Sequence, residues 1–147
     1  MTPNEPLAEG THRHFAHTLT TTAALEAIWE LWTDVQTWPS WDKEVESAHL
    51  DGPIALGQTG RLSSEGRETR IEISTWNPVK SYCFTTRLPL GSLVITRTLR
   101  TGEGLTRLTH DVELRGLGGR LLAPLLGPRF RAALPVVMQR WVELAER

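Results

Sequence analysis

Residues 67–114 have the sequence RETRIEISTWNPVKSYCFTTRLPLGSLVITRTLRTGEGLTRLTHDVEL, in which apolar and polar side chains alternate over long runs. This alternation is typical of strands with one buried and one solvated face. Short segments rich in Pro, Gly and Asn interrupt it, and such residues favour turns. Strands joined by short turns pair as antiparallel hairpins. The predicted strands cover residues 67–75, 80–88, 92–100 and 105–114.

The same alternation continues toward the N-terminus, where residues 12–20, 45–50 and 58–64 are also predicted strands. Between the first two, AALEAIWELWT (23–33) repeats apolar residues at helical spacing, and the threonines at 20–22 are its expected N-cap. DVQTWPSW (34–41) predicts a turn or a short second helix. Residues 1–10 contain two prolines and no periodicity, so we expect a flexible tail there.

Toward the C-terminus, the sequence predicts a turn and then one long helix. GLGGR (116–120) is the expected turn, and Gly127–Pro128 should place Pro128 at the first position of the helix. Apolar residues then follow at helical spacing as far as Ala145. We therefore predict an α+β fold over residues 11–147, in which a seven-stranded antiparallel sheet wraps around a long C-terminal helix and two short helices follow the first strand.

Composition excludes several classes of function. The chain has 147 residues and a net charge of −1, with its basic residues spread along it, so nothing indicates a nucleic-acid partner. A single cysteine, Cys83, excludes an intramolecular disulfide. The first ten residues hold no apolar leader and LLAPLLG (121–127) is too short to span a bilayer, so we expect a cytoplasmic protein without stable membrane insertion. Lysine occurs only at positions 43 and 80, a bias toward arginine that indicates a GC-rich, bacterial genome.

Three segments carry a family resemblance: WTDVQTWPSWDKEV (32–45) after the first helix, IALGQTGRL (54–62) and LTRLTHDVEL (105–114) before the last helix. In these motifs and in the order of its elements, the chain resembles the START-like, or SRPBCC, superfamily from about Thr11 to Arg147. It looks closest to the bacterial branch of polyketide cyclase/dehydrase and lipid-transport proteins. The resemblance implies a helix-grip fold with an internal cavity for an apolar ligand. We predict that the protein uses no cofactor.

Four of the six tryptophans fall within residues 27–45, a concentration that a core alone does not require. Trp29 and Trp32 are expected to pack the first helix onto the sheet. Trp38 and Trp41 flank Pro39, at a corner where members of the family gate the cavity. They are either core residues or part of the cavity rim.

Three polar residues share strand faces with apolar neighbours and are expected to point inward: His110, His17 and Arg97. A buried imidazole could serve as a general acid or base, although it is more often a hydrogen-bonded core residue. A buried guanidinium needs a carboxylate or an anionic or polar ligand group, unless it reaches solvent. These three are the candidate catalytic residues.

The candidate ligand contacts are inward-facing side chains of the sheet, the Pro39 corner and the last helix. Tyr82 and Thr86 either orient a mostly apolar ligand or belong to the core. No metal site is predicted, because His12 and His14 share a strand face but lack a third ligand at a suitable spacing. The full set of predicted contacts is Trp38, Trp41, Ile71, Ile73, Tyr82, Phe84, Thr86, Ile95, Arg97, His110, Phe130, Leu134 and Met138.

Three functions remain open at this point. The first is binding or transport of a small hydrophobic molecule, lipid-like or aromatic, by a monomer or homodimer. The second is a metal-free cyclase or dehydratase acting on a poly-ketone chain, with proton transfer and oxyanion stabilisation from His110, His17 or Arg97. The third is a protein-interaction module with a vestigial cavity. A cyclase should bring two or more polar inward residues together at one point, whereas a carrier needs only one.

Overall fold

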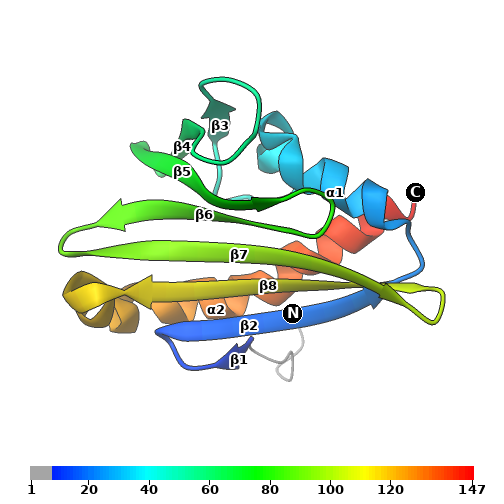
Figure 1. The fold of residues 1–147 in the computed structure, drawn as a ribbon. Helices are drawn as coiled ribbons and strands as arrows, with labels where there is room; N and C mark the ends of the chain where they lie inside the picture. The colour runs from blue at the N-terminus through cyan, green and yellow to red at the C-terminus, as the bar shows by residue number, and fades with distance from the viewer. Residues whose placement is uncertain (1–7) are drawn as a thin grey trace.

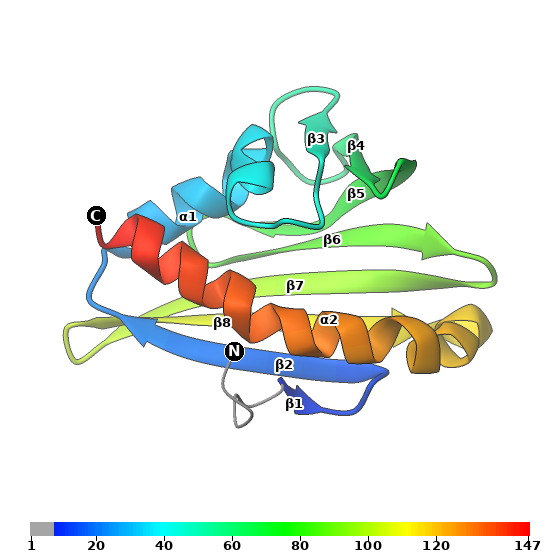
Figure 2. The same ribbon diagram turned by 180° about the vertical axis from the view of Figure 1, so that it is seen from behind.

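The structure, a computed structural model, describes residues 8–147 as one antiparallel sheet with its helices gathered on one face (Figures 1 and 2). The strands are β1 (Glu9–Gly10), β2 (His14–Thr21), β3 (Ser47–Leu50), β4 (Thr59–Ser64), β5 (Arg67–Asn77), β6 (Ser81–Leu88), β7 (Gly91–Gly102) and β8 (Leu105–Arg115). The helices are α1 (Leu25–Thr33), the 3-10 helix η1 (Val35–Ser40) and α2 (Gly116–Ala145).

The sheet has the order β1-β2-β8-β7-β6-β5-β4-β3, and every neighbouring pair is antiparallel. The seven predicted strands are all present, and the short β1 is an eighth. α2 crosses the inner face of the sheet and packs on β2, β7 and β8 (Figure 2). The predicted α+β helix-grip architecture is therefore confirmed, with one strand more than expected.

The end of the expected N-terminal tail is ordered. Ala8 is fully buried and donates its backbone N–H to the carbonyl of Arg131 in α2. Glu9 and Gly10 pair with β2. Residues 1–7 of the tail prediction lie outside the described residues. Ala8 is thus tied to the C-terminal helix, and Glu9 and Gly10 are tied to the edge of the sheet.

α2 begins twelve residues before the predicted start, because GLGGR is its first turn and not a loop. The glycines there allow contact between backbones. A Cβ on Gly118 would lie 1.6 Å from the carbonyl oxygen of Pro89, and one on Gly127 would lie 2.1 Å from that of His12. Tertiary packing of this kind stabilises a helix more than local propensity does, so the helix continues through its three prolines.

α2 is also long and apolar enough to cross a membrane, with a mean hydropathy of 1.3 in an 18-residue window. The same is true of core helices in soluble proteins, and α2 packs along the sheet. Its first half nevertheless leaves Leu117, Leu121 and Leu125 exposed. The expectation that the protein does not insert stably into membranes stays a prediction.

The predicted threonine N-cap of α1 is wrong. Thr21 ends β2, and the residue before the helix is Ala24, which has no side-chain cap. The Thr21 hydroxyl instead donates to Glu146 Oε1 at 2.6 Å and accepts the N–H of Ala23. Thr21 therefore ties β2 to the end of α2, and that tertiary bond replaces the local cap.

Tryptophan side chains form the centre of the core. Trp32 and Trp41 each pack edge-on against Trp141 of α2, with ring centroids 5.5 and 5.2 Å apart, and all three are essentially inaccessible to solvent. Trp29 lies against Trp76 of β5, as expected for a residue that fixes α1 to the sheet. Such tilted and edge-on pairs are the favoured geometry for aromatic rings.

Candidate functional site

A cavity of about 410 Å³ lies between the inner face of the sheet, the η1 segment and α2. Its walls are mainly apolar side chains from β4 to β8 and from α2. Ten of the predicted ligand contacts line it: Trp38, Trp41, Ile71, Phe84, Thr86, Ile95, Arg97, His110, Phe130 and Leu134. Ile73, Tyr82 and Met138 are buried in the core and do not line it.

The two tryptophans that flank Pro39 belong both to the core and to the cavity wall. Trp38 and Trp41 are each only 1% exposed, as core residues are, and both also form part of the cavity wall. Trp38 lies within η1 and packs against Phe84 with ring centroids 5.2 Å apart, and Trp41 follows the end of η1.

Strand register brings four polar residues into one row across the inner face. Tyr82 of β6 pairs with Arg97 of β7, Arg97 with His110 of β8, and His110 with His17 of β2. Each of them points to the same face, because side chains directly opposite one another in an antiparallel sheet share a side. Register could not be derived from the sequence, so this row is a finding of the structure.

Arg97 is the central residue of this row. It is 4% exposed, and its guanidinium carbon lies 4.8–5.8 Å from the centroids of five aromatic rings. Its Nη1 donates to the Tyr82 hydroxyl at 2.6 Å and its Nε donates to His110 Nδ1 at 3.4 Å. Within residues 8–147 no carboxylate lies within 4.0 Å of it. The charge is thus stabilised by π faces and not by an ion pair.

Tyr82 connects Arg97 to the end of α1. Its hydroxyl donates to the carbonyl of Trp32 at 2.6 Å, and the same carbonyl accepts the indole N–H of Trp38 at 3.1 Å. Carbonyls in the last turn of a helix have no partner within the helix, so Trp32 is free to accept both. Burial raises the pKa of Tyr82, and the nearby Arg97 opposes that change.

His110 is neutral in this environment. Burial lowers its pKa well below the usual value, and the Arg97 charge lowers it further. Because Nδ1 accepts from Arg97, the proton of the neutral ring belongs on Nε2. His110 therefore offers a hydrogen-bond donor to the cavity, which is not the arrangement of a general base.

His17 lies beside His110 but does not line the cavity. It is partly buried, and desolvation lowers its pKa while Glu9 acts in the opposite direction. Of the three candidate catalytic residues, the structure thus brings Arg97 and His110 together at the cavity and leaves His17 outside.

Asp42 is an acidic residue of the cavity wall that the sequence prediction missed. Burial raises the pKa of its carboxyl, while the backbone N–H of Glu44, which donates to Oδ1 at 3.0 Å, and the charge of Arg97 lower it. No sequence signal distinguishes Asp42 from a solvated turn residue. Leu126 was missed for another reason: it lies four residues before Phe130 on the same stripe, but the helix was predicted to begin at Pro128.

The rim of the cavity is charged. Glu44, Arg67 and Arg87 contribute to its lining and are exposed. Arg129 of α2 forms ion pairs with both Glu44 and Glu65, which lies in the β4–β5 turn. These contacts join the helix to the two segments across the rim from it.

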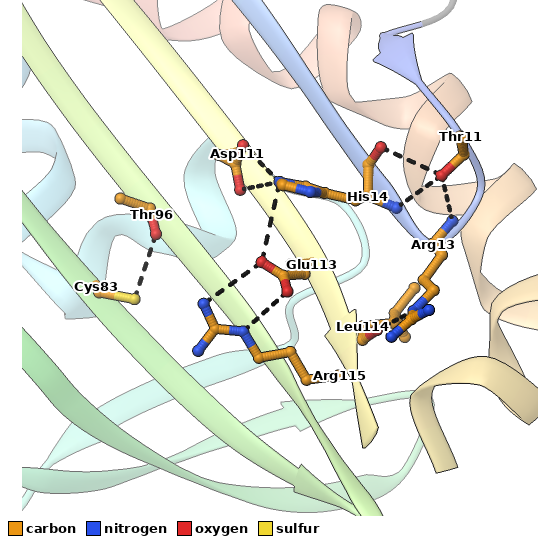
Figure 3. Close-up of polar contacts among 9 residues, drawn as sticks. All are labelled: Thr11, Arg13, His14, Cys83, Thr96, Asp111, Glu113, Leu114 and Arg115. Carbon is orange, nitrogen blue, oxygen red and sulfur yellow. Dashed lines mark hydrogen bonds and ion pairs between the residues drawn. The ribbon is translucent and has the colours of Figure 1, made fainter. Parts of the chain in front are cut away.

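A second polar cluster lies on the outer face of the sheet, away from the cavity (Figure 3). His14 contacts Asp111 at 3.0 Å, and Glu113 pairs with Arg115. Cys83 also faces outward and is buried, with its sulfur 3.3 Å from the Thr96 hydroxyl. In the described part of the chain, no three His, Cys, Asp or Glu side chains gather as metal ligands would.

The fold is shared with START-like proteins. Protein jhp0584 from Helicobacter pylori superposes with a TM-score of 0.75 at 10% identity, covering 99% of both chains. A START superfamily protein from Mycobacterium smegmatis gives 0.64 at 16% identity, covering 90% of this chain and 97% of its own. DynU16, from the dynemicin biosynthetic locus, gives 0.68 at 21% identity over 90% of this chain, but only 47% of DynU16 is covered. At such identities the likeness concerns the fold alone.

Residues 12–146 match the family described as polyketide cyclase / dehydrase and lipid transport. The chain belongs to this START-like family, as the sequence resemblance indicated. No curated protein matches the sequence. Family and fold together point to binding of a hydrophobic ligand or to cyclase-type chemistry, without naming a ligand.

Proposed function

We propose that the protein binds and carries a small hydrophobic molecule in the cavity between the sheet and α2. The observation that carries this proposal is the 410 Å³ space with mainly apolar walls, which is within the usual size of small-molecule sites, about 300–1,000 Å³. An interaction module with a vestigial cavity would instead have a filled core. We keep a cytoplasmic location and a monomer or homodimer as predictions.

Native mass spectrometry of freshly purified protein tests the proposal, followed by calorimetric titration of the delipidated protein with decanoic acid and decanol. Two neighbouring alanines of α2 provide a matched pair of variants. Ala133 lines the cavity, whereas Ala132 is exposed. Ala133→Trp should fill the space and remove binding, and Ala132→Trp should leave it unchanged. Absence of binding in the wild type, or equal binding by both variants, would overturn the proposal.

An enzyme of the cyclase/dehydratase type is the second candidate. The convergence of Arg97, His110 and Tyr82 favours it, because several polar groups meeting at one point is what such an enzyme needs. With His110 neutral and its Nε2 protonated, the pair would stabilise an enolate oxygen by donating hydrogen bonds to it. Turnover separates the candidates: a carrier returns its ligand unchanged, while a dehydratase releases a product lighter by one water.

A further inference from the structure

The Arg97 end of the cavity offers hydrogen-bond donors and almost no acceptors. A guanidinium has five N–H groups, and in the described part of the chain only Tyr82 and His110 accept from Arg97. His110 contributes its own Nε2–H.

The remaining donors of Arg97 have a defined geometry. Nε and one Nη1 hydrogen are used by His110 and Tyr82, so the second Nη1 hydrogen and both Nη2 hydrogens remain. A guanidinium presents parallel N–H groups as a fork that a carboxylate accepts in bidentate fashion, and Nη1 and Nη2 both keep free hydrogens for such a contact. Phosphate could use the same fork, but it would bring more charge into a wall that is mostly apolar.

Asp42 does not neutralise the charge of Arg97. It lines the cavity but forms no ion pair with Arg97, and one of its oxygens already accepts the Glu44 N–H. Other charged residues of the lining, Glu44, Arg67 and Arg87, are exposed at the rim. A buried cation without a partner is costly, so a ligand that supplies an anion there gains more than one that does not.

We propose that the ligand is an apolar carboxylic acid, whose carboxylate binds Arg97 and the Nε2–H of His110 while its hydrophobic body fills the rest of the cavity. This inference rests on the proposed function, since it names the class of molecule that the cavity takes. It assigns Arg97 a role in specificity: the aromatic rings around it keep the cation in place without neutralising it.

Isothermal titration calorimetry at neutral pH with two matched pairs tests this inference. The pairs are decanoic acid with decanol, and naphthoic acid with naphthalenemethanol. Each pair keeps the apolar body and replaces a charged carboxylate, which only accepts hydrogen bonds, with a neutral hydroxyl. We expect each acid to bind at least about tenfold more tightly than its alcohol, the size of one charge-assisted hydrogen bond.

Three variants locate the effect. Arg97→Met should reduce the acid preference to about onefold while leaving alcohol binding in place. Arg100→Met, an exposed arginine of the same strand, should leave the preference unchanged. Asp42→Asn removes from the cavity wall a negative charge that repels the ligand carboxylate, so this variant should bind the acids more tightly.

The outcomes separate the two proposals. Equal binding of acid and alcohol by the wild type overturns the acid inference and leaves the carrier proposal standing, and this result needs no variant to fold. An acid preference that survives Arg97→Met also overturns it, because the anion would then bind elsewhere, as at Arg67 or Arg87. Binding of no member of either pair overturns the carrier proposal itself.

Discussion

Among single residues, Tyr82 has the most consequential set of contacts. Its hydroxyl donates to the Trp32 carbonyl and accepts from Arg97, so one oxygen joins α1, β6 and β7. Both partners are buried, and a buried group that loses its partner costs more than the net value of the bond. Tyr82 thus supports the Arg97 end of the cavity without lining it.

Tyr82→Phe removes this hydroxyl while keeping the ring. We expect the free energy of unfolding to fall by about 1–3 kcal/mol, because a charged donor loses its acceptor. Urea denaturation measures the change. Thr18→Val, which removes an exposed hydroxyl from the outer face, should change stability by less than about 0.5 kcal/mol. A loss no larger than that of Thr18→Val would contradict the role given to Tyr82.

Alternation along β7 and β8 was enough to predict that Arg97 and His110 point inward. Arg97 and His110 are buried as expected from their apolar neighbours on the same face. In β5, alternation alone gives the wrong face of the sheet for Trp76. A register shift between Ile73 and Thr75 reverses the alternation, so that Trp76 pairs with Tyr82 and packs on Trp29. No residue in ISTWN (73–77) predicts this bulge. The face to which Trp76 points depends on how β5 pairs with β6.

Among the elements, α2 shows how tertiary contacts override local signals. Glycines and prolines between residues 116 and 128 predict a loop, yet the segment is helical. Gly118 is required for close approach to Pro89, and Gly127 for close approach to His12. The N-terminal half of the helix could not be predicted because its cause lies in segments distant in sequence.

Gly118→Ala tests this explanation, because helix propensity and packing predict opposite changes in stability. In an ordinary helix the change to alanine stabilises by about 1 kcal/mol. Here the new Cβ would lie 1.6 Å from the Pro89 oxygen, so backbone must move, and overpacking costs about 1–3 kcal/mol or more. Thermal denaturation should therefore show a lower Tm. Gly102→Ala, where the Cβ meets nothing within 4 Å, is the control, and a Tm for Gly118→Ala at or above the wild-type value would refute the packing argument.

For the molecule as a whole, exposed ion pairs join α2 to two segments near the rim of the cavity. Arg129 of α2 pairs with Glu44 and Glu65, which belong to segments across the rim. The hydrogen bond from Arg129, followed by its charge, lowers the pKa of Glu65. Exposed ion pairs add little to stability, so their effect should appear in the rate of ligand exchange.

The lowered pKa of Glu65 determines how ligand release should depend on pH. Since the pKa of Glu65 is lower in the folded protein than in the unfolded chain, its contact with Arg129 is complete above the unfolded pKa. The contact is lost as pH falls through the folded value. We expect release of decanol, a ligand that does not titrate, to accelerate under acid conditions and at high salt, as measured by stopped-flow displacement.

Two variants check the assignment of this effect to the rim. Arg129→Gln should release decanol quickly at every pH. Arg61→Gln, which breaks a comparable exposed pair with Glu68, should keep the wild-type profile. A pH dependence that persists in Arg129→Gln would place the titrating group elsewhere.

The tryptophans of the cavity wall make the protein its own optical probe. Trp38 and Trp41 form part of the wall, and Trp141 lies against Trp41 and beside the Arg97 cation. Indole emission responds to nearby charge and solvent, so a molecule entering the cavity changes the fluorescence of residues that it touches. Occupancy can thus be followed in unlabelled protein, and the indoles of the cavity wall become the means of observing the ligand.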